Sequence, residues 1–426
     1  MAAPHAYPED LARFVIEAGG PGFSKFSFEA LSRLLSVAFQ ASLLRDESRP
    51  VTFRLAIAPP DAFDPDAGPP NGHHRLKFDR PRPFEPQVLR RLAQAVDFRR
   101  GMIGMVEVED SFRIWGLLHS GALWLQPVRG GRRDQALPEQ PIVHVRGPGQ
   151  LLLTHGHRPV ATLSSGRVDV PAHDVFDSKW LPALFAPIRE ELMNLHEAAR
   201  NQAQAPWARL DASLTKTISQ HMVRRLLATI RESQHGGTVL IMPASITDQL
   251  LQDASTFRVR FRFDDPDPAR RFRHLILEVM NTLARTAAPD GPPVGWPEYQ
   301  ASRNARLGDL DEAIFEFAHL VAGLANIDGA VLLNQRFELM GFGVVIAGGL
   351  PEVEAVARAL DVEGQKRIRE STEAVGTRHR AVYRLCAAHA EALGIVVSQD
   401  GGIRFVRRVD DEVVYWDQVK LGSHDV

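Results

Sequence analysis

Two amphipathic helices are predicted in the middle of the chain, because apolar residues recur there at intervals of three or four positions. The first helix carries Leu181, Leu184, Phe185, Ile188, Leu192 and Leu195, and the second Ile218, Met222, Leu226, Leu227 and Ile230. A polar break at 202–206 separates them, and we place a domain boundary there. The pair Gly236-Gly237 is typical of a helix end and follows the second helix.

Strands and helices alternate after this point. Short apolar or alternating runs predict strands at 238–242, 257–263, 329–333 and 339–346. Longer runs with helical spacing predict helices at 271–284, 309–326, 351–360 and 377–393.

Local signals define several ends of these elements. Asp309 is the expected N-cap of the helix that it begins, and Gly394 is expected to end the last helix. A closing hairpin is predicted, with strands at 395–398 and 403–407 joined through the turn 400–402. The alternation as a whole predicts an α/β domain with a mixed sheet.

The first half of the chain gives weaker signals. A Leu-rich helix is expected around residues 34–35 and a strand at 52–57. The Pro- and Gly-rich segments 59–86 and 129–141 show no sustained apolar period, so we expect loops there, as at 287–297 in the second half.

The order helix, strand, strand in residues 92–118 is repeated in residues 320–346. Two explanations stay open: a decayed duplication, or the ordinary alternation of α/β elements in unrelated domains. The fold class predicted is α/β, with a mixed-sheet domain at 207–415 and a tail at 416–426. An α+β domain at 1–201 precedes it, and under the first explanation that domain is a degenerate copy.

Composition narrows the possible partners. The 426 residues include 50 Lys and Arg against 52 Asp and Glu, a formal charge of −2, so the overall field favours neither nucleic acid nor an anionic membrane. No window has the run of about 18 apolar residues that a membrane-spanning helix needs, and the start resembles no secretory signal. A single cysteine, Cys386, excludes an internal disulfide and favours the cytoplasm.

Two short motifs carry the candidate chemistry. The Asp-Gly-Ala sequence at 328–330 is, by itself, a common helix-to-strand turn. The Gly-Thr-Arg-His-Arg sequence at 376–380 opens an amphipathic helix, where free backbone N–H groups and the helix dipole attract phosphate. Arg378 and Arg380 add planar guanidinium groups that chelate phosphate oxygens, and His379 and Thr377 add further donors. Together the motifs indicate a nucleotide site.

With these motifs the second half of the chain resembles the diadenylate cyclase (DAC) domain family. The family is marked by an Asp-Gly-Ala at a strand start and by a Gly-Thr-Arg-His-Arg that opens a later helix. The resemblance also includes the strand Ile395-Val396-Val397-Ser398. It covers residues 214–414, with an insertion around 287–297.

The resemblance implies an enzyme that joins two ATP molecules into the cyclic dinucleotide cyclic di-AMP and releases pyrophosphate, working as a face-to-face homo-oligomer. Asp328 would be the catalytic residue and would bind Mg²⁺ or Mn²⁺, which helps to activate the ribose 3′-hydroxyl. The residues implied to hold the nucleotide and its phosphates are Gly329, Ala330, Gly376, Thr377, Arg378, His379, Arg380 and Ser398.

One departure from the family leaves an alternative open. Many active members have an acidic residue after the serine of that strand, whereas Gln399 follows Ser398 here. An amide binds a hard cation less well than a carboxylate does. The chain is therefore interpreted either as a cyclase, which the retained Asp328 favours, or as a non-catalytic nucleotide sensor in a signalling or defence protein. In both cases the first domain would be regulatory or would mediate dimerisation.

Overall fold

The computed structural model describes residues 5–68, 72–109, 111–119, 139–169, 174–252, 256–263, 271–399 and 401–418. The chain divides into two units, and the described residues up to Asp169 belong to the first while those from Asp174 belong to the second. The boundary predicted at 202–206 therefore lies inside the second unit. The reason is a contact that spans the chain: the rings of Trp180 and Trp416 are 4.7 Å apart.

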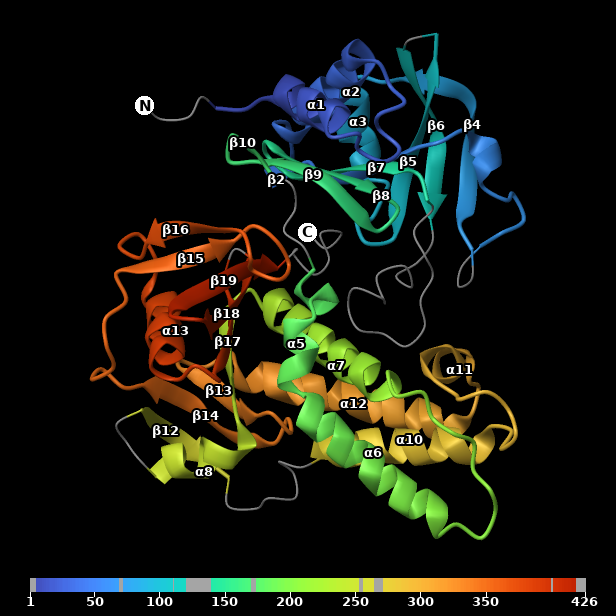
Figure 1. Cartoon of the computed structure of the whole chain (residues 1–426). Coiled ribbons are helices and arrows are strands. Elements are labelled where there is room, and N and C mark those ends of the chain that lie inside the picture. The colour runs from blue at the N-terminus through green and yellow to red at the C-terminus, as the bar shows by residue number, and fades with distance from the viewer. Residues whose placement is uncertain are drawn as a thin grey trace. The chain divides into compact units, whose positions relative to one another are not determined.

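The first unit is an eight-stranded sheet with three helices on one face (Figure 1). Its strand order is β10-β9-β8-β7-β3-β5-β6-β4. The helices are α1 (Pro8–Glu17), α2 (Phe28–Ser42) and α3 (Pro86–Ala93). The strands are β3 (Phe53–Ile57), β4 (His74–Pro83), β5 (Gly101–Val108), β6 (Ser111–His119), β7 (Pro141–Gly147), β8 (Gln150–His155), β9 (Arg158–Ser164) and β10 (Arg167–Asp169), beside a small hairpin of β1 (Arg45–Asp46) and β2 (Arg49–Pro50).

The predicted loop at 59–86 was wrong in part, because it contains strand β4. This strand lies at the edge of the sheet and is largely exposed, so it lacks the apolar alternation that marks a half-buried strand. Its two prolines, Pro81 and Pro83, also suit an edge. Of the second predicted loop, residues 129–138 lie outside the described residues, and Pro141 already begins β7.

The second unit is a nine-stranded mixed sheet in the order β12-β14-β13-β11-β17-β18-β19-β15-β16. Its strands are β11 (Gly237–Met242), β12 (Phe257–Arg262), β13 (Ala330–Asn334), β14 (Leu339–Ile346), β15 (Ala355–Ala359), β16 (Arg367–Ser371), β17 (Leu393–Val397), β18 (Ile403–Val409) and β19 (Glu412–Gln418). Its helices are α5 (Trp180–Leu184), α6 (Ala186–Asn201), α7 (Leu214–Glu232), α8 (Ala244–Gln252), α10 (Arg271–Thr286), α11 (Trp296–Ala301), α12 (Ala305–Leu324) and α13 (Thr377–Ala388).

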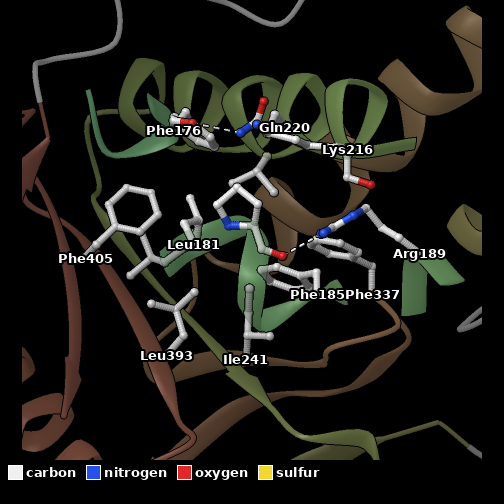
Figure 2. A pocket seen from close by; sticks show the side chains of 14 residues that line it. Phe176, Leu181, Phe185, Arg189, Lys216, Gln220, Ile241, Phe337, Leu393 and Phe405 are labelled. Carbon is white, nitrogen blue, oxygen red and sulfur yellow. Dashed lines mark hydrogen bonds between the residues drawn. The ribbon is translucent and has the colours of Figure 1, made fainter. Parts of the chain in front are cut away.

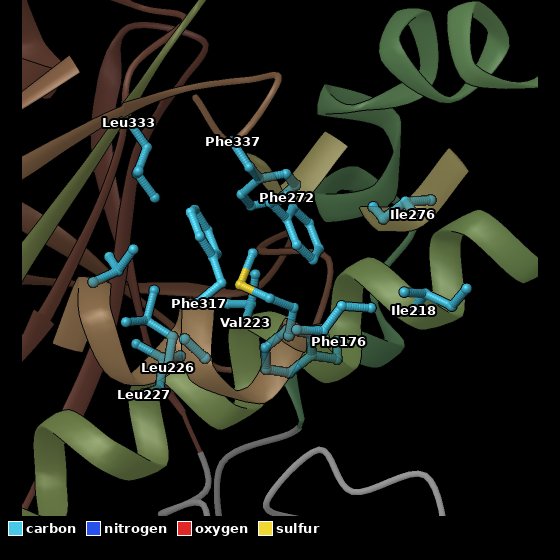
Figure 3. Packing of buried hydrophobic residues seen from close by; sticks show 14 of the residues in the cluster. Phe176, Ile218, Val223, Leu226, Leu227, Phe272, Ile276, Phe317, Leu333 and Phe337 are labelled. Carbon is cyan, nitrogen blue, oxygen red and sulfur yellow. The ribbon is translucent and has the colours of Figure 1, made fainter. Parts of the chain in front are cut away.

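Two hydrophobic cores lie on the two faces of this second sheet. Helices α7, α10 and α12 cover one face, where Phe272 stacks on Phe317 at 5.6 Å and meets Phe337 edge-on at 5.4 Å (Figure 3). Helix α13 covers the other face, with Val382 and Leu385 fully buried against the strands. The predicted α/β domain with a mixed sheet is confirmed.

One predicted helix and one predicted helix end were wrong. The segment predicted as a helix at 351–360 contains strand β15, which pairs in parallel with β19 and antiparallel with β16. It is rich in helix-forming Ala and Glu, but pairing in the sheet overrides such local preferences. Helix α13 ends at Ala388, and Gly394 lies inside β17. A Cβ there would come within 2.2 Å of Val382, so this glycine lets the helix approach the sheet.

The two sheets share one strand topology. The order β4-β6-β5-β3-β7-β8-β9 in the first unit corresponds to β12-β14-β13-β11-β17-β18-β19 in the second. Each sheet contains one parallel pair within this set, β3 with β5 and β11 with β13, and the other neighbours are antiparallel. The repeated sequence pattern falls on matching elements, α3-β5-β6 and α12-β13-β14, which favours duplication. The second unit adds β15, β16 and α13 between β14 and β17.

Candidate functional site

Strand register brings the first motif together with Ser398 at one end of the second sheet. Strands β11 and β13 are parallel with Val239 opposite Val331, and β11 is antiparallel to β17 with Gly237 opposite Val397. The start of β11 therefore lies at the same end of the sheet as the start of β13, which follows Asp328 and Gly329, and as the end of β17, which Ser398 follows. Three adjacent strand ends therefore carry the candidate residues.

Gly329 is required by the backbone at this end of the sheet. Its φ of +114° belongs to a region that residues with a Cβ rarely adopt. An added Cβ would also lie 2.7 Å from the carbonyl carbon of Gly343 on β14. Asp328 directly precedes this glycine and is exposed, so its carboxylate is available to a ligand in solvent.

The second motif begins α13. Gly376 is the N-cap residue, with φ −60° and ψ 158°, and nothing lies within 4 Å of where its Cβ would be. This leaves the amide groups of the first turn open on that side. Thr377 and Arg380 are exposed and Arg378 is half-buried. The ring of His379 lies 6.3 Å from that of Tyr383, one turn further along the helix.

Arg378 reaches the sheet end at which the first motif lies. Its Nη1 atom lies 2.9 Å from the position that a Cβ of Gly236 would occupy, and Gly236 directly precedes β11, the strand between β13 and β17. The start of α13 is therefore at the same sheet end as Asp328 and Ser398. A helix N-terminus with an arginine attracts phosphate. Thr377 and Arg380 share this first turn and are exposed.

A charged network behind α13 was not predicted from the sequence. Arg404 of β18 donates to Asp417 of β19 at 2.7 Å and to the Tyr383 hydroxyl at 3.4 Å, and it lies 4.5 Å above the ring of Tyr415. Tyr415 donates in turn to Glu370 at 2.5 Å. Since these residues come from α13 and three different strands, no local sequence signal could have grouped them.

This network has two electrostatic consequences. Burial opposes the charge of Arg404, but Asp417, Tyr383 and Tyr415 together outweigh it and raise the pKa of that guanidinium. Burial, together with the hydrogen bond to Glu370, raises the pKa of the Tyr415 hydroxyl. Arg404 therefore stays charged and Tyr415 neutral, and both keep their bonds. The network fastens α13 to the sheet and so fixes the position of its first turn.

Asp328 could hold a metal ion only if a bound nucleotide supplied further oxygen ligands. Within the described residues no group of three or more His, Cys, Asp or Glu side chains is placed to hold a metal ion. Mg²⁺ is commonly bound by one or two carboxylates plus phosphate oxygens and water, and Asp328 can supply one carboxylate. Gln399, exposed at the end of β17, offers an amide oxygen instead of a second carboxylate.

An apolar cavity of about 40 Å³ lies elsewhere in the second unit, on the face of the sheet that α7, α10 and α12 cover (Figure 2). The rings of Phe185 and Phe337, which line it, stack at 5.0 Å. Two of its polar lining residues hydrogen-bond to the backbone: Arg189 donates to the Pro182 carbonyl and Gln220 to the Phe176 carbonyl. Ligand pockets measure about 300–1,000 Å³, so this cavity is a packing gap.

Comparison with known proteins identifies one region. A family model described as a probable sensor domain, DACNV, matches residues 26–119, which run from the start of α2 to the end of β6 in the first unit. No curated protein and no solved structure matches the chain. Over the part of the chain that the structure describes, every helix is too short or too polar to cross a membrane.

Proposed function

We propose that this protein is a nucleotide sensor whose second unit binds ATP or a cyclic dinucleotide at the sheet end formed by Asp328, Ser398 and the start of α13. The observation that carries the proposal is the contact of Arg378 with Gly236, because it brings the start of α13 to the sheet end at which the first motif lies. The match of the first unit to a probable sensor domain supports a sensing role for the whole chain.

In this site the side chains have separate tasks. The amides of the first turn of α13 and the guanidinium of Arg378 bind phosphate oxygens, and Arg380 adds charge from the same turn. Gly329 lets the nucleotide approach the backbone at the start of β13. Asp328 would hold a divalent cation together with phosphate oxygens, and such a cation would supply neutralising charge.

A second candidate function, diadenylate cyclase, is favoured by the position of Asp328 at the same sheet end as Arg378. A carboxylate there can orient a metal and accept the proton of an attacking ribose hydroxyl. Because one domain holds one ATP, this reaction requires two copies of the chain to face each other. Gln399, in the place of an acidic residue, weakens metal binding and favours sensing over turnover.

Binding and product measurements on the full chain test both functions. We expect ATP or cyclic di-AMP to bind, and Arg378→Ala with Arg380→Ala to weaken Mg²⁺-dependent binding at least about tenfold, as expected for lost charge-assisted bonds. Arg369→Ala, in edge strand β16, is the matched control and should bind like the native protein. Unchanged affinity in the double variant would refute the site.

Incubation with ATP and Mg²⁺ or Mn²⁺, followed by chromatography, then separates the two functions. Binding without cyclic di-AMP formation identifies a sensor. If product forms, Asp328→Asn should abolish it while sparing most of the nucleotide affinity, because the carboxylate acts on the metal and the hydroxyl rather than on the base.

A further inference from the structure

The matching strand orders allow the sheet end of the candidate site to be aligned with one end of the first sheet. In β3 and β5, Leu55 lies opposite Ile103, as Val239 lies opposite Val331 in the second unit. Leu55 also pairs with Val143 of β7, the counterpart of Ile395. Counting from these pairs gives three correspondences. They are Gly101 with Gly329, Arg100 with Asp328, and Arg146 with Ser398.

The glycine at this position comes close to the neighbouring strand in both units, although Gly329 has a positive φ and Gly101 does not. A Cβ on Gly101 would lie 2.9 Å from the carbonyl oxygen of Leu118 on β6. A Cβ on Gly329 would lie 2.9 Å from the amide nitrogen of Val344, the residue of β14 that corresponds to Leu118. Both strand starts therefore pass equally close to the neighbouring strand, which supports the alignment by an independent contact.

The charge at this end is reversed in the first unit. Arg100, exposed just before β5, stands where the second unit has the carboxylate of Asp328. A carboxylate needs a bridging cation to hold phosphate, whereas a guanidinium binds phosphate directly through two parallel N–H bonds. The first unit thus retains the backbone of the site but carries the chemistry of a metal-free anion site.

A cavity of about 300 Å³ opens at this same end of the first sheet. It is lined by Thr52, the residue just before β3, and by Arg90 in the last turn of α3. The Nε atom of Arg90 is buried and has no hydrogen-bond partner within the described part of the chain. A buried guanidinium N–H without an acceptor is costly, and an anionic oxygen in the cavity would satisfy it.

Other charged groups around the cavity include both signs. Arg49 lines it, and so do the carboxylates of Asp46 and Glu47, so the overall field is not uniformly positive. Arg100 is not among the lining residues. Selection for an anion would come from directed donation by Arg90, with Arg100 adding a guanidinium at the same end of the sheet, rather than from net charge. The volume of the cavity suits a phosphorylated ligand better than a lone ion.

We propose that the first unit binds the phosphate groups of a nucleotide directly through Arg90 and Arg100, without a divalent metal. That the phosphates belong to a nucleotide rests on the function proposed for the second unit; the phosphate chemistry does not. The protein would then have two sites of different metal dependence, and the matched sensor region of residues 26–119 would contain the metal-independent one.

Titration calorimetry of the full chain in EDTA tests this proposal, with Arg378→Ala and Arg380→Ala present to disable the second site. We expect ATP and tripolyphosphate to bind under these conditions and adenosine not to bind. Adding Arg90→Ala and Arg100→Ala should weaken this binding at least about tenfold, whereas Arg158→Ala, at the opposite end of the first sheet, should leave it unchanged. Arg100→Lys retains the charge but loses the two parallel N–H bonds, so it should weaken binding, though less than Arg100→Gln does.

Three results would overturn the proposal: no binding in EDTA, binding unaffected by the loss of Arg90 and Arg100, or adenosine binding as tightly as ATP. If tripolyphosphate bound as tightly as ATP, the first unit would have a phosphate site, but the part of the proposal that the ligand is a nucleotide would be wrong. Melting temperatures of the variants show whether they fold, and Arg100→Gln alone, at an exposed position, should still weaken binding severalfold. These experiments test the first site independently of the second site, because the second site is tested by Mg²⁺-dependent nucleotide binding.

Discussion

The guanidinium of Arg378 lies against the backbone of Gly236, with Nη1 2.9 Å from the position of a Cβ on that residue. Gly236 has a φ of +66°, in the left-handed region that favours glycine, and its Cβ would also meet the carbonyl oxygen of Val397 at 2.6 Å. The turn before β11 is thus shaped to admit both the arginine and the neighbouring strand.

Gly236→Ala is therefore expected to destabilise the second unit by about 1–3 kcal/mol, through backbone strain and the contact with Val397. It should also weaken nucleotide binding, because the methyl group displaces Arg378. Urea denaturation measures the first effect and calorimetry the second. Gly349→Ala is the control, since nothing lies within 4 Å of its Cβ and its φ is unstrained, and its stability should match the native value closely.

Helix α12 is expected to depend on Asn304 rather than on Asp309. The Asn304 side chain accepts a hydrogen bond from the Leu307 amide at 3.2 Å and caps the helix, whereas Asp309 lies inside it. Asn304→Ala should lower the free energy of unfolding by about 1 kcal/mol and Asp309→Ala by less than about 0.5 kcal/mol. Equal effects of the two substitutions in thermal denaturation would contradict the observed cap.

The boundary between the units predicts how shortened chains behave. A chain that begins at Asp174 should unfold cooperatively, because it keeps α5 and α6 on the second unit. A chain that begins at Trp207 loses the indole bond from Trp180 to the Val362 carbonyl (3.0 Å) and the buried bond between His196 and Asn281 (2.8 Å). Its Tm should be lower by more than about 10 °C, as several kcal/mol of burial are lost. Similar melting curves would restore the later boundary.

Cys386 is expected to be inert in the folded protein. Its side chain is fully buried, and burial raises the pKa of the thiol to about 12 from an ordinary value of 9.0. Labelling with a thiol reagent at pH 8 should be negligible in the native state and reach one group per chain in denaturant. Rapid labelling of the native protein would show that α13 opens from the sheet.

The same thiol makes stability depend on alkaline pH. Above pH 9 the unfolded chain releases a proton that the folded chain retains, so the free energy of unfolding should fall as pH rises from about 9 towards 12. Cys386→Ala removes this contribution, while those of Tyr383 and Tyr415, whose pKa values burial also raises, remain. Denaturation at pH 8 and pH 10 compares the two proteins, and an equal loss in both would exclude the thiol as a cause.

Local pattern alone was sufficient for the long elements of the second half. Helices α7, α10 and α12 and strands β11, β13 and β17 are strongly apolar on their buried faces, so period and composition identified them. The motifs were also visible, because the residues within each motif, at 328–330 and at 376–380, follow one another in the chain. Edge strand β4 and strand β15 were missed, since exposure or helix-forming composition hid them.

The sequence by itself determined which residues form the two motifs, which segments have apolar faces, and that strands and helices alternate as in an α/β domain. Only the tertiary structure decided that α5 and α6 belong to the second unit, that Arg378 meets Gly236 at the sheet end where β13 begins, and that the two sheets share one strand order. Those relations depend on strand register and on contacts between residues far apart in the chain. Hydrophobic periodicity and local propensity predict neither the strand register nor these long-range contacts.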